Sequence, residues 1–427
     1  MTGTRGIRKT TGKPRKTLLS GAFLPLAVCF VFACAGAAMA QESPPPGGQI
    51  SSIEINGLKK TKLPVARYPL EKFIGRDAET LDLNEVEAVI RDMGILEPEA
   101  VELADDGGGG RILRIRVREK WSLIPFPVIS LGSGEMSFGL FVLDTNAFGL
   151  RDQAAAGGLY SPSGWMVMGM YNYTPDRSGG LGWSAGGIYN RWEREDVDRH
   201  DRVYRRYTTD TLRVFPGLRY SFTDHLSGKF GVSFTTITVQ EKVLKAPDNA
   251  MVLGFSPGLS LRYSHWDGFL LSEQSASLEY TFNAGLRGPS FHTVELGGRY
   301  EKSLLPGFRL NLQTGAAWTD SSDPLFEQNP KGADILPRNF SARYYGSFSG
   351  GLEKYLVKFR FGTISLLGSW QIVYSHGPVL GEGVDHGPSG GLRFYLSRLA
   401  VPALGIGAAY NINSGLFQFA FNLGMGF

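Results

Sequence analysis

The side chains that most often carry out chemistry are few in this sequence, and their spacing matches no catalytic or metal site. Both cysteines, Cys29 and Cys34, lie within the first 40 residues, so the rest of the chain has no thiol nucleophile, disulfide or cysteine ligand for zinc. The histidines show no His-Glu-x-x-His or other metal spacing, and His265 and His386, which each have an aspartate nearby, have no serine nucleophile signature beside them. The six histidines are His200, His225, His265, His292, His376 and His386. The sequence therefore predicts a protein that is not an enzyme and needs no metal or other cofactor.

Four consecutive glycines, at residues 107–110, are the nearest approach to a phosphate-binding loop. A phosphate loop of this kind is followed by Lys-Ser or Lys-Thr and by the first turn of a helix, whose N–H groups face the phosphate. Neither follows here, because residues 112–117 alternate between apolar residues and arginine as a strand does. A hairpin loop between two strands explains the glycines better.

The first 40 residues have the pattern of a targeting segment. They carry six basic residues and no acidic one, then an apolar run over residues 18–33 and a small-residue end at residues 38–40. This order is typical of a secretory signal peptide, and cleavage would leave Gln41 as the new N-terminus. Two alternatives are a lipoprotein site at Cys34 and a retained N-terminal anchor.

The composition of the remaining chain indicates a large β-protein. The targeting segment holds six of the 44 basic residues, which leaves 38 against 40 acidic ones, so the basic pI does not indicate nucleic-acid binding. Glycine accounts for 56 of the 427 residues, about twice the usual share of ~7 %, and aromatic residues make up 12 %.

A small α/β module is expected at residues 49–119, after a flexible proline- and glycine-rich linker at residues 41–48. Its expected elements are a strand at 50–55, a helix between 61 and 75 compromised by Pro69, a helix at 82–94 capped by Asp82, and strands at 100–104 and 112–117.

Residues 120–427 are expected to form a transmembrane antiparallel β-barrel. Apolar side chains recur with a period of two, for example from Ala276 to Asn283. Charged side chains inside long strands need an aqueous side, whereas the other face is apolar and aromatic, and a membrane barrel with a wet lumen provides both. Counting the candidate strands gives about sixteen. A soluble β-sandwich is the alternative.

Two segments of this region stand out. Residues 320–350 form a long polar connection with no strand of its own, and loops of this length are usually functional or disordered. The chain ends on an apolar stripe that resembles the sorting signal of bacterial outer-membrane proteins. Its residues are Phe419, Phe421, Leu423, Met425 and Phe427.

The order of module and barrel resembles the BamA/TamA-like superfamily of outer-membrane insertases and translocases, which includes two-partner-secretion proteins. The strand–helix–helix–strand–strand module is similar to a polypeptide-transport-associated (POTRA) domain. Residues 139–149 resemble the family's Asp-x-Asn-x-Phe-Gly segment, and residues 391–393 resemble its Gly-x-Arg segment. The matching residues are Asp144, Asn146, Gly149, Gly391 and Arg393.

The end of the long connection resembles the family's Val-Arg-Gly-Tyr motif, which lies in a loop folded back into the lumen. The corresponding residues are Arg343, Tyr344, Tyr345 and Gly346. Tyr344 replaces the family's glycine, and Gln371 occupies the place of the aspartate that would pair with the arginine. We therefore expect Arg343 to pair with Glu279 or Glu353, and Tyr344 to stack on the guanidinium or the lumen wall. A solvated loop charge at Arg343 is the alternative.

The resemblance implies a protein of the outer membrane of a Gram-negative-type bacterium, with its POTRA domain in the periplasm, that helps to insert or translocate client polypeptides. The expected partners are unfolded outer-membrane or secreted polypeptides, the lipid bilayer and periplasmic accessory proteins. An extended client could pair with an open edge strand of the module by β-augmentation. That strand comprises Ala100, Val101, Glu102, Leu103 and Ala104.

The barrel would close where its first strand, near residues 121–131, meets its last. Pro125 and Pro127 remove donors from the first strand, and Gly424 and Gly426 remove side chains from the last. We expect this seam to open more easily than any other and to expose edges that pair with an incoming strand. The alternatives are a two-partner-type secretion pore for one dedicated client and a diffusion channel or structural barrel without a protein client.

Overall fold

The computed structural model describes residues 48–427, except for residues 133–134, 174, 176–179, 268–269, 306, 360–361, 378, 380, 397–401 and 424–427. The expected signal peptide and all but the last residue of the expected linker lie outside this part of the chain. Residues 47–427 belong to one compact unit. Among the described residues, no helix is long and apolar enough to cross a membrane.

The α/β module folds in the predicted order of elements. These are β1 (Ile50–Asn56), α2 (Leu63–Arg67), the 3-10 helix η1 (Tyr68–Phe73), α3 (Leu83–Asp92), β2 (Leu96–Asp105) and β3 (Arg111–Glu119). The sheet has the order β1-β3-β2, with β1 parallel and β2 antiparallel to β3. Its buried core joins Phe73 of η1, Ile90 of α3 and Leu113 of β3. A module of about 70 residues can therefore bury an apolar core of its own.

Two details of the module differ from the sequence prediction. The helix expected between residues 61 and 75 is split into α2 and η1, and Pro69 lies in the first turn of η1, where its missing N–H breaks no bond. Strand β2 begins at Leu96 rather than Ala100, because a register shift between Pro98 and Ala100 accommodates the proline.

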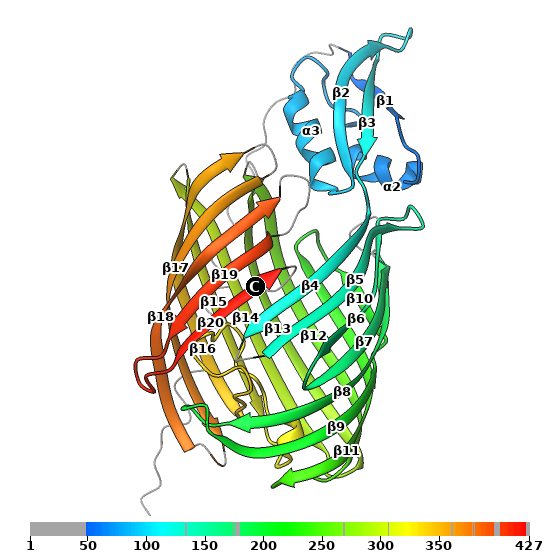
Figure 1. Ribbon diagram of the computed structural model, residues 1–427. Helices are drawn as coiled ribbons and strands as arrows, with labels where there is room; N and C mark the ends of the chain where they lie inside the picture. Colours follow the sequence, from blue (N-terminus) through cyan, green and yellow to red (C-terminus); the bar gives the residue numbers. More distant parts are fainter. Residues whose placement is uncertain are drawn as a thin grey trace, which may run out of the picture. The chain divides into compact units, whose positions relative to one another are not determined.

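All the remaining strands form one closed antiparallel sheet, in which β20 pairs with β4 (Figure 1). They are β4 (Leu123–Gly132), β5 (Glu135–Ala147), β6 (Asp152–Ser161), β7 (Gly164–Tyr173), β8 (Leu181–Val197), β9 (Val203–Val214), β10 (Gly217–Ser221), β11 (Leu226–Leu244), β12 (Ala250–Asp267), β13 (Leu270–Arg287), β14 (Phe291–Leu305), β15 (Phe308–Thr319), β16 (Tyr344–Phe359), β17 (Gly362–Gly377), β18 (Gly381–Leu396), β19 (Pro402–Tyr410) and β20 (Phe417–Leu423).

Strands β9 and β10 are two halves of a single barrel strand. Both pair with β8 and with β11, and the register with β8 is continuous, because Val214 faces Gly187 and Gly217 faces Ser184. The break falls at Pro216, which has no N–H to donate to the ladder. With these halves counted once, the 17-stranded sheet of the described residues is a barrel of sixteen strands, as the sequence predicted.

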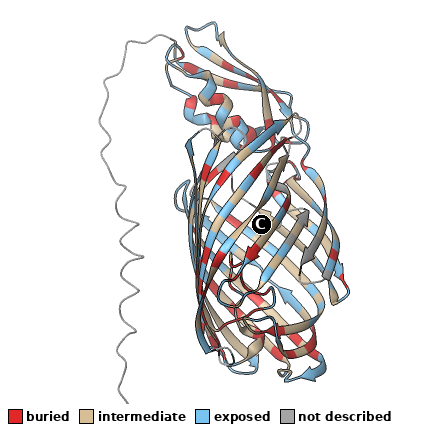
Figure 2. Ribbon diagram, turned by 60° about the vertical axis from the view of Figure 1, so that its left-hand side comes forward, coloured by how far each residue is buried: buried red, intermediate tan, exposed pale blue. Residues whose placement is uncertain are grey.

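The two faces of the barrel wall differ in chemistry, as the alternation predicts. Large apolar side chains such as Leu278 and Leu296 are exposed on the outer face, whereas the neighbouring Glu279 and Glu295 line a polar cavity inside. Figure 2 shows the resulting alternation of exposed and less exposed residues along the strands. A closed sheet of this kind has a continuous apolar outer face and a polar lumen.

Candidate functional site

The long connection between β15 and β16, residues 320–343, is packed inside the barrel. It contains the 3-10 helix η2 (Pro324–Phe326). Ile335, Phe340 and Ala342 are fully buried against Val373 of β17 and Ala409 of β19, whose outer-facing neighbours are exposed. Figure 2 shows these buried loop segments within the ring of strands. We call this segment the lumen loop.

Polar contacts fix the lumen loop to the wall. The Nε2 of Gln371 on β17 donates to Asp334 Oδ2 at 2.9 Å, and the N–H of Ile335 donates to Gln371 Oε1 at 3.3 Å. Lys331 of the loop forms an ion pair with Glu295 of β14. The residue that replaces the expected aspartate is therefore the anchor of the loop, but its partner is an acid of the loop rather than an arginine.

Arg343 does not have the partners that we predicted. Glu279 pairs with Lys229, and Glu353 is occupied by two other arginines. The Nε of Arg343 is buried with no hydrogen-bond partner among the described residues. The expected pairing of Arg343 with Glu279 or Glu353 is therefore wrong, because strand register brings other cations closer to both carboxylates.

The rest of the predicted motif lies on a strand rather than in the loop. Tyr344, Tyr345 and Gly346 begin β16, seven residues earlier than we expected, and pair with both β15 and β17. The ring of Tyr344 stacks on His376 with ring centroids 4.6 Å apart. It faces the same side of the wall as the exposed Tyr374, so it stacks neither on the guanidinium nor on the lumen wall as predicted.

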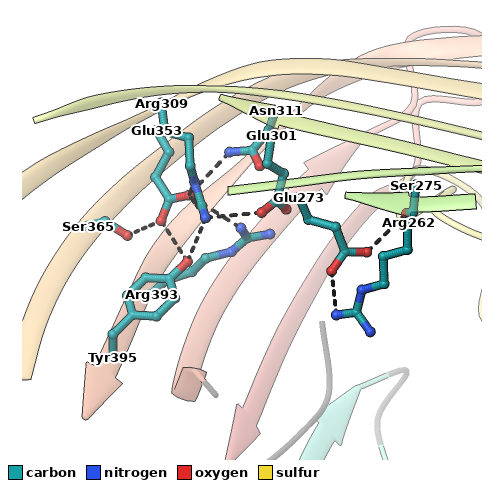
Figure 3. Close-up of polar contacts among 10 residues, drawn as sticks. All are labelled: Arg262, Glu273, Ser275, Glu301, Arg309, Asn311, Glu353, Ser365, Arg393 and Tyr395. Atoms are coloured by element: carbon teal, nitrogen blue, oxygen red, sulfur yellow. Dashed lines mark hydrogen bonds and ion pairs between the residues drawn. The ribbon is translucent and has the colours of Figure 1, made fainter. Parts of the chain in front are cut away.

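A buried ionic network that the sequence did not reveal joins five neighbouring strands, β14 to β18 (Figure 3). Its centre is Glu353, which is fully buried and bonds to Arg309 of β15 through Nε at 3.1 Å and through Nη2. Arg309 also donates to Glu301 at 3.0 Å, and Arg393 Nη1 lies 3.6 Å from Glu353 Oε2. Further donors to the carboxylate of Glu353 are Asn311, Ser365 and Tyr395.

This network balances its charges. Two guanidinium groups face two carboxylates, and every oxygen of Glu353 has a donor, so the cost of burying the charges is offset by paired geometry. Arg393 was singled out by its resemblance to a family segment, and Glu353 was proposed for a different arginine. Alternation alone places Arg309 on the lumen side, but it does not say which carboxylate it meets.

Comparison with known proteins finds solved structures with the same fold. BamA from Haemophilus ducreyi lacking POTRA domains 1–3 superimposes with a TM-score of 0.55 and 13 % identity, over 88 % of this chain and 84 % of that one. CdiB from Escherichia coli gives 0.59 and 12 %, over 88 % and 76 % of the two chains. CdiB from Acinetobacter baumannii gives 0.60 and 13 %, over 88 % and 74 %.

This chain has the fold of BamA and CdiB. No protein-family model matches it, and no curated protein matches it. The barrel fold that the sequence resemblance implied is therefore confirmed by structures that are 12 to 13 % identical to this chain.

In this BamA and CdiB fold, the Asp-x-Asn-x-Phe-Gly segment joins the module to the barrel. Lys60 of the module pairs with Asp144 at 2.8 Å, and the Nδ2 of Asn146 donates to Thr61 Oγ1 at 2.8 Å. The N–H of Lys62 donates to the carbonyl of Gly149 at 2.9 Å. Gly149 has a φ of +74°, and a Cβ there would lie 2.0 Å from the carbonyl oxygen of Lys60, so only glycine fits.

Glu119, at the end of β3, completes this joint. Its carboxylate accepts from the N–H groups of Lys59, Lys60 and Thr61 at 2.7 to 3.1 Å. Burial raises the pKa of Glu119, but these three donors outweigh burial and the net pKa lies below its ordinary value. Residues 59–61 are thus held between the module and the barrel by charge-assisted hydrogen bonds.

A second loop closes over the far mouth of the barrel, opposite the module. Arg199, in the turn between β8 and β9, donates from Nε to Asp385 Oδ2 of β18 at 2.9 Å and from Nη2 to Ser375 of β17. Its guanidinium also lies over the ring of Phe340 in the lumen loop, 5.8 Å from the centroid. The turn, the lumen loop and the opposite wall are thereby tied together.

The seam between β4 and β20 is short in the described chain. Phe421, Asn422 and Leu423 pair with Leu131, Ser130 and Ile129. The predicted C-terminal signal lies partly on β20, where Phe419 is half-exposed. Met425 and Phe427, together with Gly424 and Gly426, lie outside the described residues.

The predicted pairing strand of the module belongs to β2, one of the two edge strands of the module's sheet. Both β1 and β2 have β3 as their only strand partner among the described residues. At the start of β1, the N–H of Ile50 donates to the carbonyl of Arg76 at 2.9 Å and its carbonyl accepts from the N–H of Gly75 at 2.9 Å. The N–H of Asp106 donates to the carbonyl of Gly110 across the hairpin, so the backbone N–H and C=O groups of the even-numbered residues of β2 point toward β3. The backbone groups of Val101 and Leu103 consequently point away from the sheet.

Proposed function

We propose that this protein is an outer-membrane assembly factor that helps to insert or translocate client polypeptides, with the α/β module acting as a periplasmic POTRA domain. The observation that carries the proposal is the orientation of two prolines on the first barrel strand. The N–H of Thr145 donates to the carbonyl of Ser122 at 2.9 Å, so even-numbered residues of β4 bond to β5, and Pro125 and Pro127 face the junction with β20 without an N–H to donate. Such a seam opens at the lowest cost and offers two backbone edges to an extended partner.

The proposed route has two sites of strand pairing. A client first adds to the open edge of β2, where Val101 and Leu103 present free backbone groups and partly buried side chains. It then pairs at the seam edge of β4. The module is held on the barrel next to that edge, because Lys60 also donates to Ser122 at 3.1 Å just before β4 begins. Neither step uses a cofactor.

A dedicated secretion pore is the second candidate, and the similarity to CdiB favours it. In that case the client passes through the lumen rather than through the seam. The lumen loop and Arg199 would have to leave their positions first, because they occupy the lumen and its far mouth. The two candidates therefore differ in which part of the barrel must move.

Depletion of the protein followed by quantitative comparison of the outer-membrane proteome tests the proposal. Broad loss of β-barrel proteins supports an assembly factor. Loss of one exported protein with unchanged barrels supports the secretion pore. An unaltered proteome contradicts both and leaves a channel or structural barrel.

A further inference from the structure

Five neighbouring barrel strands, β4 to β8, are apolar on the side that faces the lumen as well as on the outside (Figure 1). Leu159 of β6 and Asn190 of β8 line a cavity inside the barrel together with Phe340 of the lumen loop, whereas Val167 and Tyr189 are exposed on the outer face. Directly paired residues share a face of the sheet, so the register extends this assignment of the lumen side to the neighbouring strands.

Three parallel rows of directly paired residues form this surface, which we call the apolar band. The middle row consists of Phe126, Phe141, Gly157, Met168 and Ile188, one from each strand. The two flanking rows, which pass through Met166 and Met170, contain only apolar residues and glycine from β4 to β7. The band is about 19 Å long across the five strands and about 13 Å wide along them.

The band is accessible from the lumen and adaptable in shape. Met166, Met168 and Met170 are all partly exposed, and Gly157 leaves the middle of the band without a side chain. Methionine fits ligands of varied shape, because its unbranched thioether side chain has several rotatable bonds. A contiguous apolar surface of this kind on a wet lumen marks a place where an apolar partner binds.

The middle row of the band ends on a cation. Ile188 pairs directly with Arg213 of β9, which is exposed and whose guanidinium lies over the ring of Phe215, 5.9 Å from the centroid. Phe215 packs on Gly186 of the band, where a Cβ would lie 2.5 Å from the ring. Arg213 has no carboxylate partner in the described part of the chain, and the residue paired with it on β11 is Thr235. The band therefore leads to a positive charge that is available to a ligand.

We propose that the apolar band and Arg213 bind one anionic phospholipid inside the lumen, with its acyl chains on the band and its phosphodiester at the guanidinium. One guanidinium matches the single negative charge of a phosphodiester and can donate two parallel hydrogen bonds to it. An acyl chain spans half of a hydrocarbon core of about 30 Å, so it fits within the length of the band, and three rows accommodate two chains side by side.

The chemistry of the band favours a lipid over a polypeptide. An extended peptide on this surface would bring backbone N–H and C=O groups against side chains that offer them no hydrogen bond, and burying such groups unpaired is costly. A hydrocarbon chain has no polar group to satisfy. The site uses no client, so this inference does not rest on the proposed function.

Photocrosslinking of the purified full-length protein in nanodiscs tests the site. The discs contain equal amounts of phosphatidylglycerol, which is anionic, and phosphatidylcholine, which is zwitterionic, with the same acyl chains. Benzoylphenylalanine is placed at the position of Met168 in the band or, as the matched control, at that of Val167, its neighbour on the outer face. Intact-protein mass spectrometry then identifies the adducts.

We expect the adduct at Met168 to be phosphatidylglycerol, in several-fold excess over phosphatidylcholine, whereas Val167 captures both lipids equally. Arg213→Gln should lower the phosphatidylglycerol adduct at Met168 on the order of tenfold, because charge-assisted hydrogen bonds to the phosphate are lost. The same substitution should leave the adducts at Val167 unchanged, since that residue faces the surrounding bilayer.

Four results would each overturn the inference: no lipid adduct at Met168 when Val167 gives one, equal capture of the two lipids at Met168, an adduct that Arg213→Gln does not lower, or capture of a polypeptide in place of a lipid. Heat-modifiable migration shows whether each variant has folded. If the barrel does not tolerate the probe at Met168, Leu159 on the adjacent strand of the band provides a second position for the same measurement.

Discussion

The wall formed by β14 to β18 and the seam between β4 and β20 differ in the interactions that hold neighbouring strands of one barrel together. The wall has long ladders and a buried network in which Glu353 binds two arginines. The seam is described only as far as Leu423, where it pairs with Ile129, and its first strand presents two prolines toward the junction. The comparison teaches that the buried ionic network lies on the wall, away from the one place that we propose has to open.

The largest effect is expected from closing the seam covalently. Ser130→Cys with Asn422→Cys joins a pair whose backbones do not bond to each other, where Cα atoms are about 4.5 Å apart and a disulfide fits. We expect a folded barrel with near-complete loss of client assembly, measured by complementation of a depleted strain with and without reductant. Ser260→Cys with Ser277→Cys, the equivalent pair between β12 and β13, is the control and should stay active. Full activity of the verified seam crosslink would exclude opening at this site.

The wall is expected to depend on Glu353. Glu353→Ala leaves Arg309 and Arg393 buried without their carboxylate, which should cost about 3–5 kcal/mol in the free energy of unfolding. The loss of stability is measured as the temperature or the urea concentration at which the barrel loses its heat-modifiable migration, and both should be lower in the variant. Glu279→Ala removes a partner of the more exposed Lys229 and should cost less than about 1 kcal/mol. Equal losses in the two variants would mean that burial does not set the difference.

The lumen loop should depend on Gln371 more than on Arg343. Gln371→Ala removes the donor to Asp334 and the acceptor for Ile335, at about 1–2 kcal/mol for hydrogen bonds of this kind. We expect faster proteolysis within residues 320–343 and larger conductance fluctuations in planar bilayers. Arg343→Ala removes a guanidinium whose Nε has no hydrogen-bond partner in the described part of the chain, so its effect on both measurements should be smaller. The reverse order would restore the role first expected for Arg343.

The smallest effect concerns pH at the joint between module and barrel. The pKa of Glu119 is lowered in the folded protein, so its contribution is fully present above the ordinary value of 4.5 and is lost as pH falls through the folded pKa. Amide exchange of residues 59–61 should therefore accelerate below about pH 4.5. Glu119→Gln should exchange faster at neutral pH and lose this acid dependence. An unchanged pH profile in the variant would assign the transition to another group.

Much of the architecture followed from local pattern. The period of two over residues 120–427 predicted strands with one apolar face, and the number of strands agrees with sixteen. Asp82 caps α3 as expected, since its side chain accepts from the N–H of Asn84. The Asp-x-Asn-x-Phe-Gly segment was noticed, but nothing in its sequence says that Asn146 meets Thr61, 85 residues away.

The sequence by itself determined which residues alternate, where donors are missing and where a strand cannot continue, because these depend on side-chain type and on neighbours along the chain. The tertiary structure alone decided which charges meet and which way Pro125 and Pro127 face. Both depend on register, and a shift by one residue turns every side chain to the other face of the sheet. That is why Glu353 was recognised as a lumenal acid but was assigned to Arg343, when closure of the barrel places it between Arg309 and Arg393.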